Sequence, residues 1–89
     1  MVIKKKAWPK EYEAVQSGAK TFDLRLQDFD VSEGDTLILE EWDPDKEDYT
    51  GRTLEKKVGY VFRFSKGELP YWPKEDVEQH GVQILSLVE

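Results

Sequence analysis

The chain has 89 residues, no cysteine and a formal net charge of −6. This length supports one domain, residues 1–89, because a second hydrophobic core would not fit, and the lack of cysteine excludes disulfides, zinc knuckles and thiol catalysis. No apolar stretch follows the basic Lys4–Lys6 run as in a signal peptide, and none approaches the roughly 20 residues of a membrane span. We therefore expect a cytoplasmic protein that does not enter a membrane.

The charges are distributed unevenly along the chain. Residues 28–48 carry ten acidic side chains and one lysine, whereas residues 1–27 carry six basic and three acidic ones. The negative net charge disfavours a protein that grips a polyanion over its whole surface, but it leaves room for a local basic site. The acidic 28–48 face is either an ordinary solvated surface or a docking surface for another protein.

The first elements are a short strand at Val2–Ile3 and a helix over about 9–17. Proline suits the first helical turn, so Trp8-Pro9 predicts the start of this helix. Gly18 predicts its end, because glycine adopts a positive φ at little cost.

The segment from 21 to 27 alternates strictly between apolar and polar residues, which predicts a half-buried strand. One face carries Phe22, Leu24 and Leu26. The other face carries Asp23 and Arg25, so the charged groups of this strand project together.

Three further strands and a helix are predicted in the second half of the chain, from apolar alternation and from proline and glycine punctuation. They are a strand over 36–39 that extends towards Trp42, a strand over 54–64 with a bend at Gly59, a helix over 74–79 and a strand over 82–88. The 43–48 segment is read as a polar loop, and Trp42 is assigned to the core. The whole order predicts a mainly β (α+β) fold, in which a small barrel has a helix over one opening.

Few residues suggest metal chemistry or a cofactor, and we expect neither. His80 is the only histidine, and its place before Gly81 favours a role at the end of a helix. Trp8 and Trp72 each adjoin a proline at a helix start, so their rings either pack on the barrel or face a ligand at its mouth.

Lys20, Asp23 and Arg25 form the one compact group of charges on the predicted elements. Arginine offers a forked set of donors and a carboxylate accepts from amines or orients the arginine, so the group suits an anion or an amide. The alternative is a surface ion pair that contributes less than about 1 kcal/mol. Spacing alone does not separate these two interpretations.

Gly18-x-Lys20-x-x-Asp23-x-Arg25 resembles the G-x-K-x-x-E-x-R signature of the ASCH domain family, in the PUA-like superfamily, with Asp23 in place of the glutamate. Four further blocks are similar to the short uncharacterised bacterial and phage branch of that family: Trp8–Tyr12, Gly34–Leu37, Glu41–Pro44 and Tyr49–Arg52. The resemblance implies a small PUA-like β-barrel with one or two short helices and a cleft lined by residues 18–25.

The resemblance also implies a function, which is the binding of RNA or a nucleotide-like small ligand. Lys20 and Arg25 would contact phosphate or base edges, and Asp23 would orient Arg25. The cleft would also be lined by Trp8, Arg52 and Trp72. We expect a monomer that makes few phosphate contacts.

One ASCH branch contains amidohydrolases that deacetylate acetylcytidine with a lysine, a threonine and a glutamate, which gives an alternative function. Lys20 matches the lysine, but Asp23 stands at the threonine position, and either Glu75 or Glu78 corresponds to the glutamate. This alternative requires a partly neutral Lys20, for which Lys4–Lys6 would supply the neighbouring cations.

Overall fold

Five strands form one sheet in the order β1-β3-β4-β5-β2 in the computed structural model, which describes residues 1–64 and 72–88. β1 runs parallel to β3, and the other neighbours are antiparallel. The elements are β1 (Val2–Ala7), α1 (Pro9–Gln16), β2 (Phe22–Leu26), β3 (Thr36–Asp43), β4 (Asp48–Phe64), α2 (Lys74–His80) and β5 (Val82–Val88).

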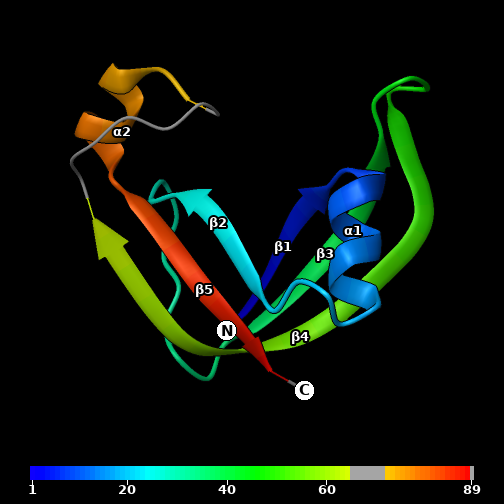
Figure 1. The fold of residues 1–89 in the computed structure, drawn as a ribbon, viewed down its shortest axis with the longest axis horizontal. Helices are drawn as coiled ribbons and strands as arrows, with labels where there is room; N and C mark the ends of the chain where they lie inside the picture. The colour runs from blue at the N-terminus through cyan, green and yellow to red at the C-terminus, as the bar shows by residue number, and fades with distance from the viewer. Residues whose placement is uncertain (65–71, 89) are drawn as a thin grey trace.

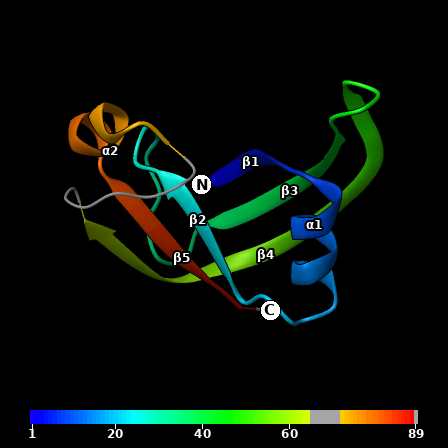
Figure 2. The ribbon, with the colours of Figure 1, turned by 45° about the horizontal axis from the view of Figure 1, so that its top comes forward.

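The sheet curls into a half-barrel whose two edges are β1 and β2 (Figures 1 and 2). α1 packs against β3, and α2 lies at the end of β2 (Figure 1). The prediction of a small, mainly β (α+β), barrel-like fold with two short helices is therefore confirmed. The barrel is open along one side, because β1 and β2 are not paired with each other within the described residues.

The core fills the inner face of the curled sheet. Alternate residues of each strand point inward, as expected for half-buried strands, and α1 covers them with Tyr12 and Val15. The buried side chains that form this cluster include Ile3, Leu37, Leu39, Val58, Leu85 and Leu87.

The ends of α1 follow the local signals in the sequence. Pro9 lies in the first turn, and Tyr12 N–H donates to the carbonyl of Trp8 at 2.8 Å. Gly18 follows the last turn with φ +86°, and Lys20 N–H donates to the carbonyl of Ala14 at 2.9 Å. The left-handed glycine thus turns the chain directly from α1 towards β2.

Two strands are longer than the sequence predicts. β1 continues through the three lysines to Ala7. Lys5 lies on the inner face between buried Ile3 and Ala7, and its ammonium lies 3.8 Å from the centre of the Phe29 ring. β4 begins at Asp48 rather than at Leu54, and residues 44–47 of the predicted loop form the turn of the β3–β4 hairpin.

The assignment of Trp42 to the core is wrong. Alternation along β3 places Leu39 and Glu41 inside, so Trp42 faces outward and is only half-buried. Its ring meets Tyr49 edge-on with centroids 5.0 Å apart, and the Lys6 ammonium lies 3.8 Å above it. At Gly59, where a bend is predicted, the β4–β5 register shifts between Val58 and Tyr60.

Candidate functional site

The polar face of β2 points into the hollow of the half-barrel. Asp23 is only 5% exposed, whereas Phe22 on the opposite face is 44% exposed. The register explains this direction, since Asp23 lies opposite Leu85, a fully buried residue on the inner face of β5. The alternating pattern was read correctly as a strand, and the charged face of that strand is the inner one.

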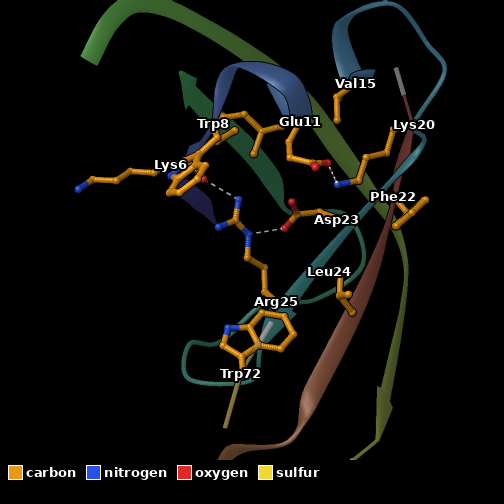
Figure 3. Close-up of a pocket in the computed structure, with 12 residues that line it drawn as sticks. Lys6, Trp8, Glu11, Val15, Lys20, Phe22, Asp23, Leu24, Arg25 and Trp72 are labelled. Carbon is orange, nitrogen blue, oxygen red and sulfur yellow. Dashed lines mark hydrogen bonds and ion pairs between the residues drawn. The ribbon is translucent and has the colours of Figure 1, made fainter. Parts of the chain in front are cut away.

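A pocket of about 500 Å³ lies where this inner face meets α1 and the end of β1 (Figure 3). Its volume lies within the range of about 300–1,000 Å³ that is typical of small-ligand sites. The pocket is lined by charged, aromatic and aliphatic side chains: Lys6, Ala7, Trp8, Glu11, Val15, Lys20, Phe22, Asp23, Leu24, Arg25, Leu39 and Trp72.

Arg25 spans the open side of the half-barrel. Its Nε donates to Asp23 Oδ2 at 2.7 Å, and its Nη2 donates to the backbone carbonyl of Lys6 at 2.8 Å. One guanidinium therefore connects β2 to β1, the two edges that no backbone ladder joins within the described sheet. Its Nη1 takes part in neither bond, and the side chain keeps 25% of its surface exposed.

Lys20 is held by a residue of α1 that the sequence analysis did not select. Its Nζ donates to Glu11 Oε2 at 2.7 Å, which lowers the pKa of the Glu11 carboxyl. Figure 3 shows this pair beside the Asp23–Arg25 pair along the same pocket. The spacing of Glu11 places it on one helix face with Trp8 and Val15. This helical periodicity, combined with the signature on the next strand, would have identified Glu11 as a site residue.

The two tryptophans that the sequence associated with a ligand both line the pocket. Trp8 caps the start of α1 and is 60% exposed, whereas Trp72 is partly buried. In Figure 3 they lie on opposite sides of the Arg25 guanidinium. A planar ligand at this position would meet an aromatic ring near each end of the charged group.

The expectation that Arg52 lines the cleft is wrong for the part of the chain that the structure describes. Arg52 Nε and Nη2 donate to Glu41 Oε1 and Oε2 at 2.9 and 2.8 Å, and its guanidinium lies 4.8 Å from the centre of the Tyr12 ring. Thr50 Oγ1 donates to the same carboxylate at 2.7 Å. This bidentate pair joins the two strands of the β3–β4 hairpin, and the contact of Arg52 with Tyr12 connects the hairpin to α1.

The stability of the fold is expected to depend on pH through Glu41. Hydrogen bonds from Arg52, and next from Thr50, lower the pKa of Glu41 to about 2, from an ordinary value of 4.5. A carboxyl whose pKa is lowered by folding contributes stability above its unfolded pKa and loses it as the pH falls towards the folded value.

Wild-type protein should therefore resist urea better than Glu41→Gln at pH 7, and the difference should shrink between about pH 4.5 and about pH 2. Urea midpoints across this range test the expectation. A difference that stays constant down to pH 2 would contradict the assigned ion pair.

The glutamates suggested for the amidohydrolase alternative lie outside the pocket. Glu75 and Glu78 are exposed on α2, and Glu78 Oε1 lies 3.9 Å from Lys74 Nζ. The Lys6 ammonium extends away from the pocket towards Trp42, and that of Lys5 lies over a ring elsewhere. The expected cations therefore do not gather around Lys20 in the described structure.

The acidic residues of 28–48 do not share one face. Glu40 and Glu41 lie on opposite sides of β3, and Asp35 holds the amino terminus at 3.1 Å and accepts a hydrogen bond from Ser32 N–H.

Among residues 1–64 and 72–88, no group of three acidic or histidine side chains could hold a metal ion. His80 is exposed in the last turn of α2. No described helix is both long and apolar enough to cross a membrane.

Comparisons with known proteins identify a family and a shared fold. The model of the family described as "Domain of unknown function (DUF3850)" matches residues 3–70. Among solved structures, the crystal structure of the hypothetical protein PH0355 is similar, with a TM-score of 0.75 and 16% sequence identity over 99% of this chain and 98% of that chain. At this identity the likeness shows the fold alone. The comparison with curated proteins found no match.

Proposed function

Since the chain belongs to the DUF3850 family, whose function is not known, we propose from its pocket that it is an ASCH-type binding module for a nucleotide-like ligand. The ligand is either a free nucleotide or one unpaired nucleotide of an RNA. The proposal rests on one observation: Lys20, Asp23 and Arg25 of the signature line a pocket of about 500 Å³ together with Trp8 and Trp72.

The proposed binding uses the chemistry of each group. A base stacks on a tryptophan ring, as unpaired bases do in many RNA-binding proteins. The Asp23 carboxylate has acceptor capacity beyond its bond to Arg25 Nε, so it accepts from an exocyclic amine or ring N–H. Lys20 and the remaining donors of Arg25 bind the phosphate.

The amidohydrolase alternative requires a lysine with a free lone pair. Lys20 is instead ion-paired with Glu11 at 2.7 Å. We therefore propose binding without turnover. Incubation with acetylcytidine should leave it intact, and deacetylation that is lost in Lys20→Ala would replace the proposal with the enzymatic alternative.

Replacement of Lys20 by alanine is expected to weaken binding of cytidine monophosphate about 10- to 100-fold, because a hydrogen bond to a charged group contributes about 1.5–3 kcal/mol. Tryptophan fluorescence titrations check this value. Lys57→Ala is the matched control, since it removes one exposed lysine from β4, outside the pocket lining.

The same titrations with single-stranded RNA at two salt concentrations separate the two forms of the ligand. With one or two phosphate contacts, the slope of log K against log salt should be about −0.7 to −1.4. Binding of RNA but not of the mononucleotide would assign the site to RNA. Undetectable binding of both at low salt, or equal affinities for wild-type protein and Lys20→Ala, would contradict the proposal.

A further inference from the structure

The outer face of the sheet is divided into a charged half and an apolar half. On β1, β3 and the first part of β4, outward residues include Lys4, Glu40 and Glu55. Beyond the register shift at Gly59, the outward residues of β4, β5 and β2 carry no charge. Six of these residues form the outer apolar patch, Phe22, Leu24, Tyr60, Phe62, Ile84 and Ser86, and the Lys57–Val88 pair lies at its rim.

The patch is built by strand register. Phe22 and Tyr60 flank Ser86 in one row, and Leu24 and Phe62 flank Ile84 in the next. Such cross-strand neighbours share one face, so the two rows form a continuous surface across three strands.

The patch remains largely open to solvent in the single chain. Tyr60 is 61% exposed, Phe62 is 52% exposed and Phe22 is 44% exposed. Isolated apolar residues on a surface are ordinary, but a contiguous group rimmed by polar residues marks an interaction site. Aromatic residues with few charges are typical of the centre of such an interface.

We propose that this patch is the dimer interface of the protein and that its occupant is the same patch of a second copy. A net charge of −6 opposes the association of two copies, and this opposition is smallest where the touching surfaces carry no charge. A two-fold contact places the same surface on both partners, and an uncharged sheet face satisfies this requirement without opposite charges.

The exposed area sets the strength of this dimer. An aromatic side chain buries about 150–250 Å² when fully covered, so the three half-exposed rings contribute about 100 Å² each. With the aliphatic members, two copies bury roughly 800–1,000 Å² in total, which is below the roughly 1,200 Å² of stable specific interfaces and in the range of weak, transient ones. We therefore expect a weak, reversible dimer in place of the monomer expected from the sequence.

The interface also borders the candidate site. Phe22 and Leu24 belong to the patch and line the pocket, because β2 is the edge strand between them. A second copy on the patch would therefore lie beside the pocket mouth. The dimer itself does not depend on the proposed ligand, so the two proposals can fail separately.

Sedimentation equilibrium over a rising concentration series tests the dimer. The apparent mass of wild-type protein should rise with concentration from the 10.4 kDa of one chain towards twice that mass. Phe62→Asp and Tyr60→Asp should stay monomeric and fold normally, because both side chains are about half exposed or more. Thr53→Asp is the matched control: it adds the same charge to the charged half of the outer face and should dimerise like wild type.

A wild-type mass that stays at one chain throughout the series would overturn the proposal. Equal dimerisation of wild type and Phe62→Asp would overturn it as well, since the interface would then lie elsewhere. Loss of RNA binding in Phe62→Asp, with wild type monomeric, would assign the patch to nucleic acid instead.

Discussion

Asp23→Ala is expected to lower the free energy of unfolding by about 2–3 kcal/mol and to abolish ligand binding. Asp23 is 5% exposed and accepts a hydrogen bond from Arg25 Nε, so its removal leaves the guanidinium without its charged partner. Breaking a fully buried ion pair in this way costs about 3–5 kcal/mol. The expected loss of stability for Asp23→Ala is smaller than that of a fully buried pair, because Arg25 keeps 25% of its side chain exposed.

Urea unfolding and nucleotide titration together test this prediction. Asp23→Asn is the control, since its amide oxygen still accepts from Arg25 while the charge is lost; it should keep most of the stability and bind nucleotide weakly. An Asp23→Ala protein with wild-type stability and wild-type affinity would show that the Asp23–Arg25 pair neither joins the half-barrel edges nor forms the site.

Gln83→Met is expected to raise the free energy of unfolding by about 1–2 kcal/mol. Gln83 is fully buried on β5 between Arg25 and Arg63 of the neighbouring strands, and neither its Nε2 nor its Oε1 has a hydrogen-bond partner among the described residues. A buried polar atom without a partner costs about 1–3 kcal/mol, whereas an apolar side chain of similar shape avoids that cost.

Thermal unfolding measures this gain, which should raise the melting temperature by about 4–8 °C for each kcal/mol in a domain of this size. Gln79→Met is the matched control, because Gln79 is exposed on α2 and the same replacement there should change little. A lower melting temperature for Gln83→Met would mean that the amide is hydrogen-bonded in solution, for example to a buried water.

Local signals predicted the elements around the site correctly. Pro9 and Gly18 determine where α1 begins and ends, and strict alternation identified β2. The sequence does not predict which face of β2 points inward. A period of two separates the two faces of a strand, but it does not identify the face that lines the hollow. The inward direction of Asp23 follows from its pairing with Leu85, more than 60 residues away.

Contacts between distant segments account for the errors. Arg52 and Glu41 meet because the β3–β4 register, in which Glu40 lies opposite Thr53, brings the next residue of each strand together. Trp42 faces outward because alternation along β3 points Leu39 and Glu41 inward. Glu11 was missed because its partner Lys20 lies beyond the turn at Gly18, so the pair forms only when β2 folds back beside α1.

The central claim is that the inner face of β2 forms a nucleotide site with α1. A two-dimensional ¹H–¹⁵N NMR titration with cytidine monophosphate tests it most directly, because each backbone amide and each tryptophan indole reports separately. We expect the largest shift changes on Trp8, Lys20, Asp23, Arg25 and the Trp72 indole, and little change in the 43–48 hairpin. Shift changes centred on that hairpin, or none at saturating nucleotide and RNA, would contradict it.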